Sequence, residues 1–256
     1  MKTFVTIIFI TFYSLKSTAQ NNTYEVGGFV GFNNMQTDYG QPDEFSSYFK
    51  KNGQSLSIAH YTHFFNLTQR WNRKYGIHDH LMIKTELQYI NNTFTHNDIY
   101  SNSNSENGAK LRGMESTVNI LNTGINAEYH LKSLTNFFNP YADVSFNPFV
   151  GVGVNYFFYN NDLTSTLGDW RNDFSVLPEK FSGDALAVGS GSGFAVNFYG
   201  GARYKLTNKT DLALQISSQY FFSDKIDGLD AQVEENQSNE IMLNFQLGLI
   251  YHLNFN

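Results

Sequence analysis

The chain has 256 residues, no cysteine, and a formal net charge of −6 that comes from 17 basic and 23 acidic side chains. The lack of cysteine excludes disulfide bonds and thiolate chemistry, and the acidic balance argues against nucleic acid as a partner. Aromatic residues make up 16% of a chain that is only 41% hydrophobic. This composition is typical of a membrane β-barrel, in which alternation dilutes the apolar residues and aromatic girdles mark the rims.

The N-terminus has the pattern of a secretory signal peptide. Lys2 precedes an apolar stretch over residues 4–15, and residues 17–19 read Ser-Thr-Ala, a small-x-small cleavage site. The apolar stretch is shorter than the roughly twenty residues of a membrane-spanning helix. We therefore predict a signal peptide at 1–19 and an exported barrel domain at 20–256. Removal of the signal leaves 15 basic and 23 acidic residues, and the lack of cysteine excludes a lipid-anchored lipoprotein.

Eight segments alternate apolar residues with polar or small ones, as strands do when one face meets lipid. The least regular of them, at about 55–66, is included mainly because the strand count needs it. No segment shows helical periodicity. In chain order the predicted strands cover 23–32, about 55–66, 80–91, 119–131, 148–158, 194–206, 212–222 and 241–256. An even strand number is what a bacterial outer-membrane barrel requires, so the predicted fold is an all-β, eight-stranded antiparallel transmembrane barrel.

The last strand has the clearest pattern. Every odd position from 241 to 255 is apolar or aromatic, while even positions include Asn244 and Gln246. Its sixteen residues would reach roughly 50 Å at about 3.3 Å per residue, enough to cross a membrane with flanks to spare. We expect its end, with Tyr251, Leu253 and Phe255, to resemble the signal that barrel-assembly machinery reads.

The connections give a second test of the barrel. From a periplasmic N-terminus, the outer connections are predicted at roughly 33–54, 93–114, 159–192 and 223–239, and the inner ones at roughly 67–79, 132–145 and 207–210. Every outer connection is then longer than every inner one, as is usual for outer-membrane barrels. The outer segments are rich in Asn, Ser, Asp and Gly, including the glycine-rich run at 189–193, and are predicted to be surface loops.

The inward faces of the predicted strands carry glycines and charges. An eight-stranded barrel is just wide enough for its own side chains to fill it. Unpaired charges inside it would be costly, so we predict an internal network of ion pairs and hydrogen bonds that blocks the lumen. The charged members of this predicted network are Glu25, Lys84, Glu86, Glu128, Arg203 and Lys205.

Two groups of side chains could hold a cation. The last outer connection contains Asp224, Asp227 and Asp230, whose oxygens suit calcium. Their spacing departs from that of an EF-hand, so a solvated interaction loop is the alternative. His78 and His80 flank Asp79 in an inner turn, but the sequence points to no further ligands there. We predict no cofactor.

A lipid-modifying enzyme would need a nucleophile and a base near the outer rim. His96, Asp98 and Ser101 lie in one predicted outer loop and could fill those roles. Loops rich in such residues also arise from solubility alone, so no catalytic residue is assigned.

One stretch, residues 201–230, combines an Arg-Tyr strand, a turn, a second strand and a Phe-x-Asp-x-x-Asp-Gly loop. Weaker matches lie at 24–40, 110–115 and 147–160. Together they resemble a family of small outer-membrane barrels, the PorG-like proteins associated with type IX secretion and gliding, and their uncharacterised relatives. The resemblance implies an outer-membrane barrel with an accessory role in secretion, and it supplies no catalytic residues.

The sequence therefore favours a non-enzymatic protein of the outer membrane, structural or accessory in the cell envelope. Its expected partners are outer-membrane lipids, the barrel-assembly machinery, and envelope or secretion-system proteins. Two alternatives stay open. One is an outer-membrane lipid-modifying enzyme, and the other is a soluble periplasmic barrel whose apolar faces point inward.

Overall fold

The computed structural model describes residues 24–39, 53–63, 76–96, 99–139, 141–181, 185–230 and 239–253. The predicted signal peptide at 1–19 lies outside the described residues, and so does Phe255 of the predicted assembly signal.

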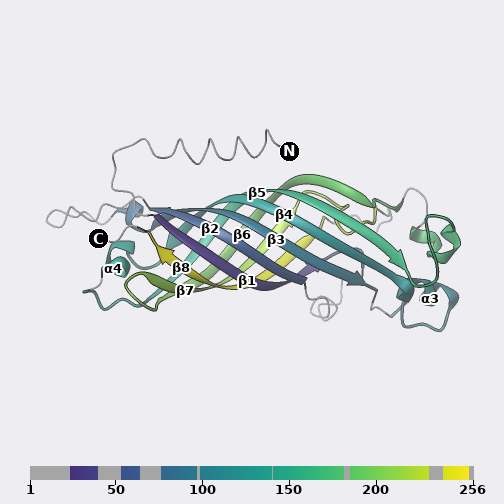
Figure 1. Cartoon of the computed structure of the whole chain (residues 1–256), viewed down its shortest axis with the longest axis horizontal. Helices are drawn as coiled ribbons and strands as arrows, with labels where there is room; N and C mark the ends of the chain where they lie inside the picture. Colours follow the sequence, from purple (N-terminus) through teal and green to yellow (C-terminus); the bar gives the residue numbers. More distant parts are fainter. Residues whose placement is uncertain are drawn as a thin grey trace.

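Eight antiparallel strands form a closed barrel, in which each strand pairs with its sequence neighbours and β8 pairs back with β1 (Figure 1). The closing register sets Glu25 opposite His252 and Gln36 opposite Ile241. The predicted fold is therefore confirmed. The strands are β1 Tyr24–Gln36, β2 Gly53–His63, β3 Leu81–Thr95, β4 Met114–His130, β5 Phe146–Ser165, β6 Gly189–Lys205, β7 Thr210–Phe221 and β8 Ile241–His252.

Strand β1 begins and strand β8 ends at the same end of the barrel, where the amide of Leu253 donates to the carbonyl of Tyr24. We call this the inner end and the opposite one the outer end. The short connection 206–209 between β6 and β7 lies at the inner end. Outer-membrane barrels keep such short turns on the periplasmic side, which places the inner end in the periplasm.

The outside of the barrel wall is apolar. Val30, Ile58 and Val154 are each about 60% exposed, whereas the inward-facing neighbours Phe29 and Ala59 are buried. Strand alternation produces this separation, because successive side chains point to opposite faces. A soluble barrel with its apolar faces inward is therefore wrong, since the exposed wall would be unstable in water.

Two aromatic belts border this apolar band. In the inner belt Tyr24 stacks on His60 and His80 stacks on Tyr129, at 5.5 and 5.3 Å between ring centroids. The inner belt consists of Tyr24, His60, His80, Tyr129, Phe146, Tyr204 and Tyr251; the outer belt consists of Phe32, Tyr89, Tyr156, Phe158, Phe194, Tyr220, Phe222 and Phe245. Paired girdles around an apolar band are what a bilayer selects in a β-barrel.

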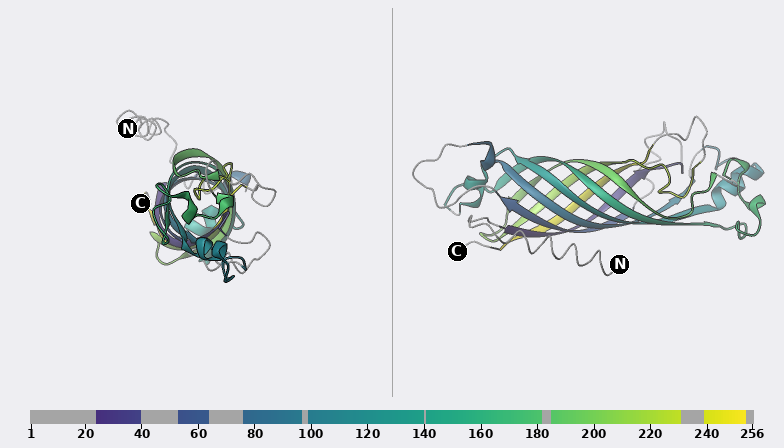
Figure 2. Two further views of the ribbon diagram at one scale, coloured as in Figure 1. Left: turned by 90° about the vertical axis from the view of Figure 1, so that its right-hand side faces the viewer. Right: turned by 90° about the horizontal axis from the view of Figure 1, so that it is seen from above.

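Strands β3 to β6 continue past the outer belt, and in the side views the wall extends well beyond the ends of β1 and β8 (Figures 1 and 2). The outward side chains of this extension are polar. Ser190 donates to Asn160 across β5 and β6, and Tyr89 of the belt donates to Asn119. We call this part the polar collar; its outward residues are Asn91, Thr93, Thr117, Asn119, Asn160, Asp162 and Ser190.

The strand expected at about 55–66 is present as β2, Gly53–His63, and residues 64–66 lie outside the described residues. Two expectations about the connections were wrong. The inner connection 64–80 is longer than the outer connection 37–52. The glycine run 189–193 opens β6 instead of lying in a loop, because its glycines leave room for the β5 rings of Phe157 and Tyr159.

Short helices also occur in the connections, although the sequence shows no helical periodicity. They are α3 Glu106–Gly113 and α4 Leu134–Phe138, each capped by a serine side chain at its N-terminus, and the 3₁₀ turns η1 Ile77–Asp79, η2 Phe174–Val176 and η3 Glu179–Phe181. Among the described residues, no helix has the length and apolar character needed to cross a membrane.

Candidate functional site: the ion-pair cluster and the closed lumen

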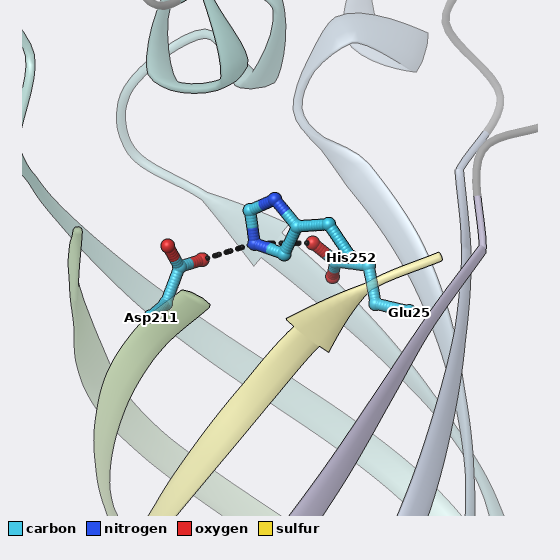
Figure 3. Close-up of side chains that lie close together, drawn as sticks. All are labelled: Glu25, Asp211 and His252. Atoms are coloured by element: carbon cyan, nitrogen blue, oxygen red, sulfur yellow. Dashed lines mark hydrogen bonds and ion pairs between the residues drawn. The ribbon is translucent and has the colours of Figure 1, made fainter. Parts of the chain in front are cut away.

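A buried cluster of charged side chains lies at the inner end of the lumen. Glu25 comes from β1, Asp211 from β7 and His252 from β8, and all three point into the barrel (Figure 3). The imidazole Nε2 of His252 lies 2.9 Å from an oxygen of Asp211 and 3.1 Å from an oxygen of Glu25. One histidine therefore joins the first strand to the last two at the point where the barrel closes.

Arg203 of β6 neutralises the two carboxylates. Its Nη2 lies 2.9 Å from both oxygens of Glu25 and 2.8 Å from Asp211. His63 adds a contact of 3.4 Å to Glu25. Such buried carboxylates are tolerated only when cations and hydrogen bonds compensate their loss of hydration.

Ligand atoms of Glu25, Asp211 and His252 lie within 4.8 Å of one another, and in the described part of the chain no other set of three such side chains does. A divalent cation among them would lie beside the fixed positive charge of Arg203, which already contacts both carboxylates. The cation and the guanidinium would then share the same two carboxylates, and two positive charges this close repel strongly in a buried site. The arrangement therefore suits an ion-pair cluster and not a metal centre.

Residues 131–139 fold under the cluster and close the inner end of the barrel; we call them the inner lid. Phe138 of α4 packs edge-on against His63 and His252, at 4.8 and 5.1 Å between centroids. The Arg203 guanidinium lies 5.5 to 5.8 Å from the rings of Tyr61, Phe137 and Phe138. These cation–π contacts shield the ion pairs from water.

Asp79 holds the inner lid in place from the neighbouring connection. Its carboxylate accepts hydrogen bonds from the hydroxyls of Ser133 and Thr135 and from the Thr135 amide. Asp79, which the sequence places between His78 and His80, therefore binds the inner lid. His80 contacts the carbonyl of His130 and stacks on Tyr129 of the inner belt.

The other predicted lumen charges lie further along the barrel. Lys84 pairs with Glu86 at 2.9 Å and donates to Gln215. Glu128 accepts from the Tyr199 hydroxyl at 3.0 Å and lies 3.3 Å from His130. Lys205 is only half-buried at the inner end, where its ammonium donates to the carbonyl of Asn139 and lies 5.2 Å from the Phe137 ring. The six residues therefore form two ion pairs, Glu25–Arg203 and Lys84–Glu86, one carboxylate held by Tyr199 and His130, and one cation at the rim.

Amide side chains fill the middle of the lumen. Asn122 and Asn155 both donate to Gln219, and Gln215 donates to Gln246. A cavity of about 10 Å³ lies among these amides, bordered by Glu86 and Asn197. A volume of this size holds about one water molecule, so this space among the amides is too small for a larger solute.

Apolar side chains fill the outer half of the lumen and continue into the outer connections. Phe157 and Phe221 pack edge to face at 4.9 Å, and both are fully buried. The lumen members of this outer plug are Met35, Ile90, Phe94, Met114, Val118, Ile120, Phe157, Leu163, Ala195, Phe221 and Met242, and Tyr39, Leu177, Phe181, Ile226 and Leu229 cover them from the connections. The lumen is therefore filled along its whole described length.

The segment 222–230 folds over the outer mouth. Asp227 is buried, and its oxygens accept from the amides of Asp38 and Leu229. Asp230 pairs with Lys225 at 2.8 Å, whereas Asp224 is partly exposed. The three aspartates of the predicted cation or interaction loop thus lie in three different environments: Asp227 binds backbone amides, Asp230 pairs with a lysine, and Asp224 is partly exposed. They do not form a shared cation site.

Glu240 fixes the other side of this segment. The residue is buried, and one of its oxygens accepts from the Ile226 amide at 2.9 Å. Burial, together with the neighbouring carboxylates of Asp227 and Asp224, holds the pKa of Glu240 well above its usual value. Folding therefore favours the protonated acid at this position.

Two of the residues considered for lipid modification, His96 and Ser101, are buried and do not face the bilayer. His96 lies inside the outer mouth, where it contacts the rings of Tyr39 and Phe181 at 4.6 and 5.6 Å. Ser101 is buried, and Asp98 lies outside the described residues.

Several members of the site were not singled out from the sequence, chiefly Asp211, His252, His63, His130 and Tyr199. All of them occupy strand positions whose side chains face the lumen. Extending the predicted strand 212–222 by one residue at the inner end would have found Asp211. His252 already lies in the predicted last strand, at a position whose side chain faces the lumen.

No protein-family model matches the chain, and no curated protein matches it. Among solved structures, it is similar to Neisserial surface protein A, with 11% identity, 91% of this chain and 99% of that chain covered, and a TM-score of 0.48. It is also similar to a major outer membrane protein from Thermus thermophilus, with 13% identity, 91% and 100% covered, and a TM-score of 0.48. A third is the outer membrane enzyme PagL, with 10% identity, 89% and 98% covered, and a TM-score of 0.35. At these levels the likeness says nothing about activity.

The closed barrel, its apolar outer wall and its two aromatic belts define the class of protein. The chain is a small eight-stranded β-barrel of the bacterial outer membrane.

Proposed function

We propose that the protein is a non-enzymatic, non-conducting structural barrel of the outer membrane, which acts through the parts that project from the bilayer. The filled lumen is the observation that carries this proposal. The ion-pair cluster, the central amides and the outer plug occupy the inner, middle and outer parts of the described lumen, with a cavity of about 10 Å³ among the amides. A barrel with such an interior has its accessible surfaces at its two ends and on its lipid-facing wall.

The outer end is the larger of the two projecting parts and supports a role in contact with partners. It consists of the polar collar and of connections that hold exposed apolar side chains. Ile99 and Tyr100 are 70% and 67% exposed, and Phe174 is 49% exposed. Aromatic side chains of this kind are enriched where proteins bind other proteins.

We further propose that this partner belongs to a cell-envelope assembly. The resemblance of residues 201–230 to PorG-like barrels is the reason to test type IX secretion components first. Outer-membrane lipids and the barrel-assembly machinery are proposed as the contacts of the lipid-facing wall and of the C-terminal strand.

Site-specific photo-crosslinking in cells tests the proposal. A photoreactive residue at Tyr100 or Phe174 probes the outer end, one at Tyr141 probes the inner end, and one at Val152 probes the lipid-facing wall. We expect the two outer positions to capture the same envelope protein, identified by mass spectrometry, and the Val152 position to capture lipid. Capture of one protein equally from all four positions, or of none from the outer two, would count against the outer-end role.

The lipid-modifying alternative has its own measurement. Deletion of the gene followed by lipid mass profiling should leave lipid A and phospholipids unchanged. A changed profile that the wild-type gene restores, and that His96→Ala does not, would replace the structural role with an enzymatic one.

A further inference from the structure

The two ends of the barrel carry opposite charge. The four outer connections hold 15 acidic and 7 basic side chains, a balance of −8, whereas the three inner connections hold 2 acidic and 5 basic ones, a balance of +3. Of the two inner acids, Asp79 is buried and bound to the inner lid. The acids Glu25 and Asp211 are near this end as well, but they lie inside the lumen and pair with Arg203. Three of the five inner basic residues, Arg70, Arg73 and Lys74, lie outside the described residues. The described ones are Lys132 and Lys209, which share the inner rim with the exposed Asp143.

The cations of the two ends also differ in their partners. At the outer end Lys110, Arg171 and Lys225 each pair with a carboxylate, at 3.1, 2.9 and 2.8 Å. At the inner rim Lys132 and Lys209 are exposed, and neither pairs with a carboxylate in the part of the chain that the structure describes. Exposed cations without local counter-charges are available to an external anion.

The two lysines lie directly beyond the inner aromatic belt. The Lys132 ammonium lies 5.9 Å from the ring of Phe146, a belt residue. The carbonyl of Lys209 accepts from the amide of His252, which follows Tyr251 of the belt. Belt aromatics sit at the level of the lipid headgroups, so lysines one step further out reach the phosphates of the same leaflet.

We propose that the inner rim binds the phosphate groups of anionic phospholipids in the periplasmic leaflet, through Lys132 and Lys209. The depth of the belt and the two exposed lysines beyond it fit this ligand, and the acidic outer connections do not. Binding at this rim fixes the depth and orientation of the barrel in the bilayer. Each lysine near an anionic surface favours the bound state by about fivefold.

The full-length barrel is tested in lipid nanodiscs that contain phosphatidylcholine and phosphatidylglycerol in equal amounts. Lipids that stay bound after gentle release are counted by native mass spectrometry. We expect the wild-type barrel to retain phosphatidylglycerol in preference to phosphatidylcholine. The double variant Lys132→Gln with Lys209→Gln should show a lower ratio of retained phosphatidylglycerol to phosphatidylcholine, by about fivefold for each lysine removed. The matched control, Arg171→Gln with Lys225→Gln at the outer end, should keep the wild-type preference.

Equal retention of the two lipids by wild type would overturn the proposal, and so would an equal loss in the control variant. If polyglutamate binds the rim in a salt-dependent way while no lipid preference appears, the rim serves an acidic periplasmic polymer and the lipid assignment is wrong. Heat-modifiable migration of each variant on gels verifies that it is folded, so that a lost preference is not a loss of the barrel.

Discussion

Removing Arg203 should destabilise the barrel more than removing any exposed cation. Arg203→Met leaves Glu25 and Asp211 buried without their shared guanidinium, which now contacts three carboxylate oxygens at 2.8 to 2.9 Å. Breaking a fully buried ion pair costs about 3–5 kcal/mol, because the remaining charge keeps its desolvation penalty. We therefore expect the free energy of unfolding to fall by about 3–5 kcal/mol.

The control is an arginine with the same pair distance at the surface. Arg171 lies 2.9 Å from Asp162, but both side chains are more than half exposed. Arg171→Met should cost less than about 1 kcal/mol. Reversible urea unfolding in detergent micelles, followed by tryptophan fluorescence, measures both variants.

A combined variant separates charge from packing. Changing Glu25 to Gln and Asp211 to Asn in the Arg203→Met background removes the uncompensated charges and should recover part of the lost stability. Equal losses in Arg203→Met and Arg171→Met would refute the reasoning that the cluster is a desolvated unit.

Three further predictions follow from the lumen, the outer mouth and the last strand. Gly151→Ala places a methyl group against the Tyr199 ring and should cost about 1–3 kcal/mol, whereas Gly28→Ala, with nothing within 4 Å, should cost far less in the same unfolding assay. Because the folded pKa of Glu240 is raised, its stabilising effect is present below the carboxyl pKa of the unfolded chain and is lost as pH rises through the folded value. Wild type should therefore lose stability relative to Glu240→Gln as pH rises, and parallel pH profiles would contradict this. Phe255→Ala should lower the amount of heat-modifiable barrel without changing export, and a normal amount of barrel would count against an assembly signal.

Alternation predicted the lipid-facing wall well, because a bilayer imposes one rule on every strand that crosses it. Beyond the outer belt the rule reverses. In the first part of β4, Met114 and Val118 point inward to the outer plug, while Glu115 and Thr117 point to water. A search for apolar residues on the outward face therefore misses the start of β4 and the end of β5.

The ion-pair cluster could be predicted only in part. Parity alone places Glu25 and Arg203 inside the lumen. Their contact with each other depends on the closed barrel, since β1 and β6 are not neighbours. The contact between Glu25 and His252 depends on the register in which β1 pairs with β8, which sets the two residues opposite each other. Alternation shows which face a side chain is on, but it does not say which residue of the neighbouring strand lies opposite.

The inner lid lay beyond sequence reasoning for a different reason. The five residues of α4 are too few to form a helix from local propensity. The helix forms because Asp79, from another connection, binds Ser133 and Thr135, and because Phe137 and Phe138 fill the end of the lumen. Such tertiary causes leave no periodic trace in the sequence.

A closed lumen underlies the proposed function. Planar bilayer recording of the purified full-length protein tests it most directly, with a general porin inserted in the same bilayer as a positive control. The filled lumen predicts no stepwise current from the wild-type barrel over the voltage range in which the porin conducts. Reproducible conductance steps from the barrel alone would contradict a closed lumen, and with it the proposal that the protein acts only through its projecting parts.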